Sequence, residues 1–239
     1  MPHAVVSDIH GNLQALERVL ADIDRRHVDA IACLGDFVGY GADPNPVMDL
    51  LVPRIEVAVV GNHDLAACGR VPLDYFNPDA AASAIWTQRE LTPGHRAYLE
   101  ALPMTASWRG LWLVHASPVT PEAWHYVLST GEAADEMRAY AEDVCVIGHS
   151  HVAGNFERDG RSVRYFRDPE VPRRSGHKLL INAPSVGQPR DGDPRAGYLL
   201  IEDDQITHVR LDYDIAEAAR RIEAAGLPHA LGARLQWGE

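Results

Sequence analysis

Five short apolar runs, each followed within two residues by Asp, His or Asn, constrain this 239-residue chain more than any other feature. Runs of this kind are typical of strands that are buried on both faces of a parallel sheet. Because ligands of open α/β sheets collect at the carboxyl ends of the strands, we expect the polar residues to form one site. The segments after the runs are Ser7-Asp8-Ile9-His10, Gly35-Asp36, Gly61-Asn62-His63-Asp64, His115 and Gly148-His149-Ser150-His151.

The first third of the chain alternates between strand and helix patterns. Apolar residues recur at helical spacing from Leu13 to Ile23, and Asn12 before them is a candidate N-cap. Pro44 opens a second, short helix that ends at about residue 51. Strand, helix, strand, helix, strand in this order predicts parallel strands joined by right-handed crossovers.

Residues 65–102 change character and predict a helical insertion of two helices, which start at Asn77-Pro78 and Thr92-Pro93. A hairpin around 104–115 and a helix at 131–141 follow. The second half is strand-rich, at about 152–157, 161–166, 179–182, 196–202 and 205–211, with a final helix near Asp214. Since the proposed site draws on residues from 8 to 151 and no linker is evident, we expect residues 1–239 to form a single domain.

Composition excludes several classes of protein. Lys+Arg 22 against Asp+Glu 34 gives a net charge of −12, which argues against a broad nucleic-acid surface but permits a small anionic substrate. Three widely spaced cysteines argue against a disulfide framework or a zinc ribbon. Without a basic, apolar leader or a long apolar run, we expect a cytoplasmic protein with no membrane partner. The oligomeric state is left open.

Seven residues are candidate metal ligands. The pairs Asp8/His10 and His149/His151 are each two residues apart, so in extended chain their side chains point to the same side. The Asp36 carboxylate has two oxygens and could bridge two cations. Mixed imidazole and oxygen ligands favour Mn, Fe, Zn, Co or Ni over Mg or Ca. If both ions share Asp36, the seven residues provide four ligands for each of two divalent ions. The candidates are Asp8, His10, Asp36, Asn62, His115, His149 and His151.

These five segments, in this order, resemble the motifs of the calcineurin-like metallophosphoesterase superfamily. The resemblance implies a four-layer α/β/β/α sandwich, an α/β fold (α+β in some schemes) in which two mixed sheets are flanked by helices. It also implies two ligand sets that share one carboxylate. They are Asp8, His10, Asp36 and His151 for one ion, and Asp36, Asn62, His115 and His149 for the other.

Such a site suits hydrolysis of phosphate esters. Two cations about 3.5–4 Å apart can clamp phosphoryl oxygens, and a water between them becomes a hydroxide that attacks phosphorus. His63 directly follows Asn62 and is not needed as a ligand, so it is the natural proton donor for the leaving oxygen; the resemblance assigns it the same role. Asp64 could hold the His63 ring in the useful tautomer, or could simply cap the helix that follows.

The substrate is less well defined by the sequence. The Ser/Thr protein phosphatases of this superfamily have a phosphate-binding Arg in the second motif, and here Gly39-Tyr40 holds its place. The chain therefore looks closer to the small bacterial and archaeal phosphodiesterase-like members. Arg190 and Tyr40 are candidate substrate-binding residues; Arg190 could bind phosphate or could make surface salt bridges. Trp124, His125 and Tyr126 could cover an aromatic part of the substrate or anchor their loop.

Three functions compete. A phosphodiesterase is favoured because a diester monoanion needs fewer cations than a monoester dianion, and the second-motif Arg is absent. A phosphomonoesterase or nucleotide-type phosphohydrolase would use the same ligands and differ only in the pocket walls. A non-catalytic metal-binding scaffold is disfavoured, because scaffolds tend to lose a ligand or the proton donor and both are intact here.

Overall fold

The computed structural model describes residues 2–239 and contains two β-sheets of six strands each. The strands are β1 (His3–Val6), β2 (Ala30–Cys33), β3 (Ile55–Ala58), β4 (Thr105–Trp108), β5 (Leu111–Val114), β6 (Val144–Ile147), β7 (Gly154–Asp159), β8 (Ser162–Phe166), β9 (Glu170–Pro172), β10 (His177–Asn182), β11 (Ala196–Ile201) and β12 (Gln205–Leu211). The first sheet has the order β3-β2-β1-β11-β12-β9 and the second the order β4-β5-β6-β10-β7-β8. Both combine parallel and antiparallel pairs and are therefore mixed.

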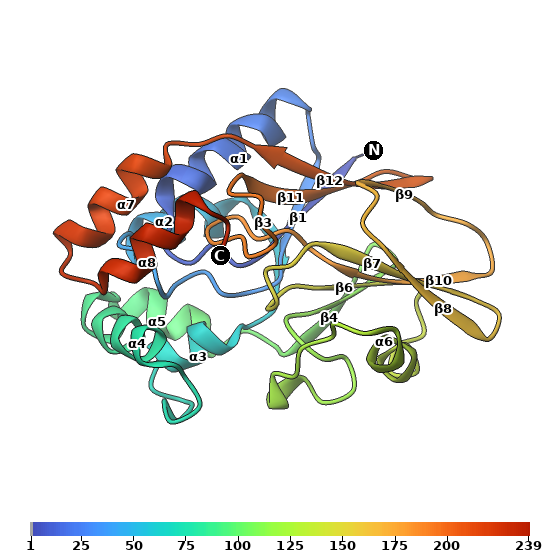
Figure 1. The fold of residues 1–239 in the computed structure, drawn as a ribbon, viewed down its shortest axis with the longest axis horizontal. Coiled ribbons are helices and arrows are strands. Elements are labelled where there is room, and N and C mark those ends of the chain that lie inside the picture. The colour runs from blue at the N-terminus through green and yellow to red at the C-terminus, as the bar shows by residue number, and fades with distance from the viewer. Residues whose placement is uncertain (1) are drawn as a thin grey trace.

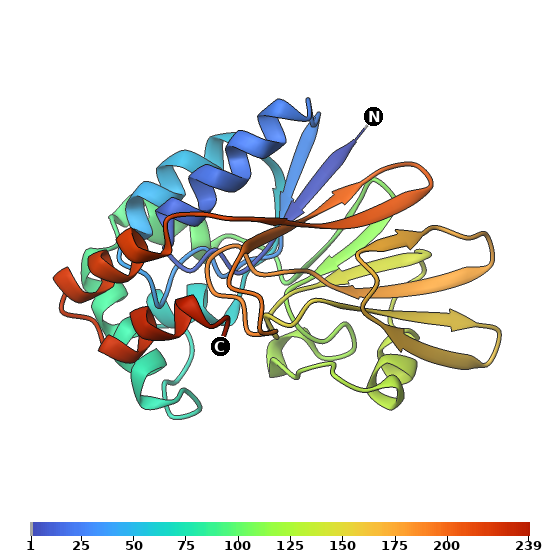
Figure 2. The ribbon, with the colours of Figure 1, turned by 45° about the horizontal axis from the view of Figure 1, so that its top comes forward.

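Helices cover the outer faces of both sheets (Figure 1). They are α1 (Leu13–Arg25), α2 (Pro44–Leu51), α3 (Asn62–Ala67), α4 (Pro78–Glu90), α5 (Pro93–Glu100), α6 (Thr130–Glu136), α7 (Ile215–Ala224) and α8 (His229–Ala233), with short 3₁₀ turns η1 (Val52–Arg54), η2 (Pro121–Ala123) and η3 (Arg234–Gln236). In the turned view α1 and α2 lie over the first sheet, whereas α6 lies on the opposite side of the molecule, against the second sheet (Figure 2).

The apolar core confirms the four-layer arrangement. Along β1 the side chains alternate between two layers, as strand geometry requires. Val5 packs between the sheets with Leu113 and Ile181, whereas Ala4 packs on the outer face with Leu16 of α1. A third cluster, on the far face of the second sheet, packs against α6. The expected α/β/β/α sandwich is therefore confirmed.

Strand direction brings the carboxyl ends of five strands together. In the first sheet β1, β2 and β3 are adjacent and parallel, and in the second β5 and β6 are adjacent and parallel. These are the strands formed by the five apolar runs. Because parallel neighbours end at the same edge, the polar segments that follow them are placed side by side.

The predicted helix starts agree with the structure. The Asn12 side-chain oxygen Oδ1 accepts a hydrogen bond from the Ala15 amide at 3.1 Å, and the side chains of Asn77, Thr92 and Asp214 cap their helices in the same way. In the part of the chain that the structure describes, no helix is long and apolar enough to span a membrane.

Some elements differ from the expectation. Three helices, not two, lie between β3 and β4, because α3 begins at Asn62 itself. The helix expected at 131–141 ends at Glu136, since Met137 and Tyr140 turn into the core and the Tyr140 hydroxyl donates to the Leu179 carbonyl at 2.9 Å. Strand β9 was not predicted, because a three-residue edge strand that contains Pro172 has no alternating pattern.

Candidate metal centre

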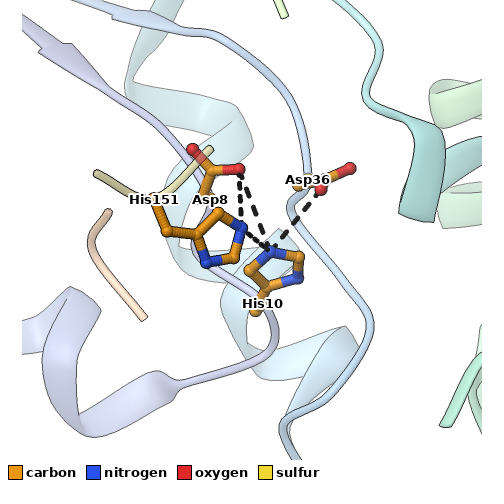
Figure 3. A group of neighbouring side chains, drawn as sticks. All are labelled: Asp8, His10, Asp36 and His151. Carbon is orange, nitrogen blue, oxygen red and sulfur yellow. Dashed lines mark hydrogen bonds and ion pairs between the residues drawn. The ribbon is translucent and has the colours of Figure 1, made fainter. Parts of the chain in front are cut away.

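The structure brings six of the seven candidate ligands into two groups that share Asp36. The ligand atoms within each group lie within 4.8 Å of one another, and all six residues are buried. Figure 3 shows the first group, whose carboxylates and imidazoles face one another. The groups are Asp8, His10, Asp36 and His151, and Asp36, His115 and His149. The seventh, Asn62, opens α3 at the edge of the neighbouring cavity.

Imidazole nitrogens and carboxylate oxygens face one another within the groups, at distances slightly longer than a usual N–H···O hydrogen bond. His151 Nε2 lies 3.3 Å from Asp8 Oδ1, and His10 Nε2 lies 3.5 Å from Asp36 Oδ2. His115 Nε2 lies 3.3 Å from the same Asp36 oxygen. One carboxylate oxygen therefore faces imidazoles from both groups.

The backbone at the site adopts an uncommon conformation. Asp8, His10, Asp36, His149 and His151 have φ angles of 54°, 50°, 52°, 63° and 58°. The left-handed region is uncommon for residues other than Gly, although Asp and His enter it more readily than most. Such conformations persist only where the surroundings hold them, and they cluster at functional sites. Here they follow directly on β1, β2 and β6 and turn the ligand side chains toward one another.

Four histidines have a defined tautomer. His10, His115 and His151 place Nδ1 at 3.1, 2.7 and 2.6 Å from the carbonyl oxygens of Val38, Leu34 and Gln188, and His149 places Nε2 at 2.8 Å from that of Trp124. A carbonyl can only accept, so each ring must donate through that nitrogen. The other nitrogen is then free to bind a metal, which is the usual second-shell arrangement of metal-binding histidines.

Several buried polar atoms at the site have no partner. They include Asp36 Oδ2, Asn62 Oδ1 and His115 Nε2. In addition, the Nε2 atoms of His10 and His151 lie 3.1 Å apart, although both rings already donate through Nδ1. Buried polar atoms without a partner are costly. The donor set therefore fits divalent cations, with Asn62 as an oxygen ligand beside the second group.

The charges of the site depend on one another. Burial opposes ionisation of Asp8 and Asp36. However, the facing His151 ring holds the pKa of Asp8 below its usual value, and the facing His115 ring does the same for the pKa of Asp36. Burial lowers the pKa of His149 to about 3 and so favours the neutral, metal-binding form of this ring. For His115, burial is outweighed by the Asp36 and Asp8 carboxylates, which raise its pKa to about 9 in the metal-free chain.

His63 lies at the site as expected, but Asp64 does not orient it. Asp64 accepts hydrogen bonds from the amides of Gly61, Asp36 and Val38 at 3.0, 2.8 and 3.3 Å, so it caps α3 and fixes the loop that carries Asp36. Of the two roles that the sequence allowed for Asp64, the structure shows the helix cap, because backbone amides rather than the His63 ring use both of its oxygens. The His63 Nδ1 atom is buried without a partner.

Packing positions the His63 ring instead. The rings of Tyr40, His10 and Phe76 lie 4.3, 4.9 and 5.0 Å from it, measured between centroids. Gly39, with a φ of +89°, closes the remaining side, and a Cβ there would lie 2.7 Å from His63 Nδ1. Burial lowers the pKa of His63 to about 4, and the Asp36 carboxylate opposes this.

Replacing Gly39 by alanine should therefore displace His63 and leave the metal ligands in place. We expect kcat for esters with poor leaving groups to fall roughly 10–100-fold, because an error of about 1 Å in a catalytic group can cost this much. The matched control is Gly160→Ala, where φ is +61° and no heavy atom lies within 4 Å of the added Cβ. Equal activity of the two variants, measured at equal metal content, would contradict this account of His63.

A cavity of about 500 Å³ adjoins the metal residues. Asn62, His63 and His149 line it, together with Arg190 and Tyr40, the two candidate substrate-binding residues. Trp124 and Tyr126 also line it, and Tyr126 stacks on His149 at 4.4 Å between centroids. His125, which we grouped with them, is not among the lining residues.

Sequence reasoning missed three residues of this region. Tyr75 and Phe76 line the cavity from the segment before α4, and Tyr75 is 92% exposed. Arg234, from η3 near the C-terminus, places its guanidinium over the Tyr40 ring. The only local signal was Asn77-Pro78, which marks a helix start and says nothing of the aromatic pair before it.

The fold and the clustered carboxylates and imidazoles define a two-sheet α/β sandwich protein with a candidate metal site. The sequence model of the calcineurin-like phosphoesterase superfamily domain matches residues 1–205. The chain belongs to this superfamily.

Two relatives share 38% of their residues with this chain. One is the uncharacterised protein MJ0912 of Methanocaldococcus jannaschii, matched over 98% of this chain and 97% of its own length. The other is a metallophosphoesterase of known structure from Sphaerobacter thermophilus, with a TM-score of 0.88 over 100% of this chain and 99% of that one. A hypothetical protein, PH1004, from Pyrococcus horikoshii is 18% identical but shares the fold, with a TM-score of 0.82 over 100% and 98% of the two chains.

Proposed function

We propose that this protein is a dinuclear metal-dependent hydrolase of small phosphate esters, with a preference for diesters. The observation that carries the proposal is the pair of ligand groups that share Asp36, in which His115 Nε2 and Asp36 Oδ2 are buried without partners. Each of the four candidate histidines presents a free nitrogen because a backbone carbonyl fixes its tautomer.

Each residue of the two groups has a proposed role as a metal ligand. Asp8, His10 and His151 would hold one ion, Asn62, His115 and His149 the other, and Asp36 both. When bound, two divalent ions offset charge on the phosphoryl oxygens and activate water as the nucleophile. The left-handed backbone at five of these residues fixes the ligands before any ion arrives, which limits the cost of ordering them.

His63 would give a proton to the leaving oxygen. Its ring is part of the cavity lining, and its position is fixed by Gly39, Tyr40 and Phe76. A neutral His63 can hydrogen-bond to the leaving oxygen, and an anionic substrate beside it would raise its pKa and favour full proton transfer.

The aromatic walls of the cavity would hold the organic part of the ester. Trp124, Tyr126, Phe76 and Tyr75 line the cavity and offer flat apolar surfaces beside the metal residues. A diester presents two substituents to such a cavity. A monoesterase is the second candidate, because the Arg190 guanidinium lines the same cavity and could hold the extra charge of a monoester.

A substrate panel tests the proposal. Metal-stripped protein is supplied separately with Mn²⁺, Ni²⁺, Co²⁺, Fe²⁺, Zn²⁺ and Mg²⁺ and assayed with bis(p-nitrophenyl) phosphate and p-nitrophenyl phosphate. We expect a transition metal to restore hydrolysis and kcat/KM to be higher for the diester. Failure of every metal on both esters would contradict the hydrolase assignment, and a higher kcat/KM for the monoester would favour the second candidate.

A further inference from the structure

Two arginines converge on the Tyr40 ring beside the metal centre. The guanidinium carbons of Arg190 and Arg234 lie 5.4 and 4.7 Å from the centroid of this ring. The same ring lies 4.6 Å from the ring of His10 and 4.3 Å from that of His63. Tyr40 therefore packs against two histidines of the site and also contacts the guanidinium groups of both arginines.

Neither arginine has an acidic partner. Between residues 2 and 239 no Asp or Glu oxygen lies within 4.0 Å of either guanidinium, although the chain holds 34 acidic residues. Both share one side-chain acceptor, the Gln188 Oε1 atom, which lies 3.1 Å from Arg190 Nη2. The Nε atoms of the pair are buried without partners, and within the described chain they are the only arginine nitrogens so placed.

This arrangement is suited to an anion. Burial and the adjacent charge of Arg190 lower the pKa of Arg234, so the two cations repel each other in a partly dehydrated place. A buried hydrogen-bond donor without an acceptor is costly. A planar guanidinium fork that stacks on an aromatic ring keeps its edge free for two oxygens, which is the geometry that binds phosphate.

The pair is firmly connected to the metal residues. The Gln188 carbonyl oxygen lies 2.6 Å from His151 Nδ1, and the Arg190 amide donates to the His151 carbonyl at 3.1 Å. Arg234 belongs to η3, beyond residue 205, where the match to the superfamily model ends. In both views the C-terminus lies next to the loops that follow the strands (Figure 1, Figure 2).

We propose that Arg190 and Arg234 form a second anion site, which binds a non-reacting phosphate of the substrate. The proposal rests on the proposed function, since it assumes that the reacting phosphate lies over the metal ligands. Asp8 and Asp36 offset only part of the positive charge of two divalent ions, and the two arginines add further positive charge. A diester with one phosphate carries a single negative charge, so the site suits a diester with a second phosphate.

Two matched substrates test this site. Methyl p-nitrophenyl phosphate is a diester with one phosphate, and 3-phosphopropyl p-nitrophenyl phosphate is a similar diester with a terminal second phosphate. We expect Arg234→Gln to raise KM for the second substrate about 10–100-fold, and Arg190→Gln to act in the same direction. For both variants the loss in kcat/KM should be about tenfold larger for the second substrate than for the first. The control is Arg220→Ala on α7, which removes only an exposed ion pair with Glu217.

The outcomes separate the alternatives. Equal losses on the two diesters, in variants with unchanged melting temperature, would overturn the second anion site. A larger loss on p-nitrophenyl phosphate than on either diester would also overturn it, because the arginines would then bind the reacting phosphate. If no ester is hydrolysed, the proposed function fails, and calorimetric binding of 1,3-propanediol bisphosphate still tests the pair: tight binding that is lost in Arg234→Gln supports the site, and no difference refutes it.

Discussion

Replacing Asp36 by alanine is expected to lower the metal content of both sites and to abolish turnover. Asp36 is the one residue common to both ligand groups, and its Oδ2 atom faces imidazoles from each. Because two metal ions supply several kcal/mol of charge stabilisation in such a reaction, we expect a loss of roughly 10³-fold or more in kcat/KM. Elemental analysis of the purified variant and the diester assay measure the two effects.

Two further variants make this result specific. Asp36→Asn keeps an oxygen that can accept from the His63 amide, as Oδ1 does at 2.9 Å, but it removes the negative charge, so it should also lose metal. Asp49→Ala, at an exposed carboxylate on α2, should retain both ions and full activity. A wild-type protein with one tightly held ion, unchanged in Asp36→Ala, would contradict the shared carboxylate.

Replacing His63 by alanine is expected to leave both ions bound and to slow the reaction. General acid assistance is typically worth about 10²–10⁴-fold, so we expect a loss of this size in kcat for alkyl esters. A nitrophenolate leaving group needs less protonation, so the loss with nitrophenyl esters should be smaller. The measurement is kcat for the two kinds of ester at equal metal content.

His95→Ala is the matched control for this variant. His95 lies outside the site and contacts Asn45 and Asp49 near the surface, so its loss should not change the rate. If His63→Ala lost metal, His63 would be a ligand, and if it kept full activity on alkyl esters it would not be the proton donor. Either result would refute the role given to it.

Local patterns were sufficient to predict the strands, the helices and the position of the site, whereas the four layers were implied by the resemblance to the superfamily. Each apolar run that became β1, β2, β3, β5 or β6 is followed by its polar residues within a few positions, so both signals are local. Helix starts at Asn12, Asn77 and Thr92 were predicted for the same reason, because a cap is formed by neighbours in the chain.

The parts that were not predicted depend on competition or on distant packing. The sequence left Asp64 with two roles, at the His63 ring or as a helix cap, and the amides at the start of α3 and in the Asp36 loop are what bind its carboxylate. Arg234 is separated from Tyr40 by nearly 200 residues, and only the packing of the C-terminal helices brings them together. No spacing pattern reports such a contact.

The most direct test of the central claim is anomalous diffraction from crystals of the protein loaded with Mn²⁺. We expect two peaks per chain, one beside Asp8, His10 and His151 and the other beside Asn62, His115 and His149, with the Asp36 carboxylate between them. A single peak, or a peak away from Asp36, would contradict the dinuclear site from which the proposed reaction is derived.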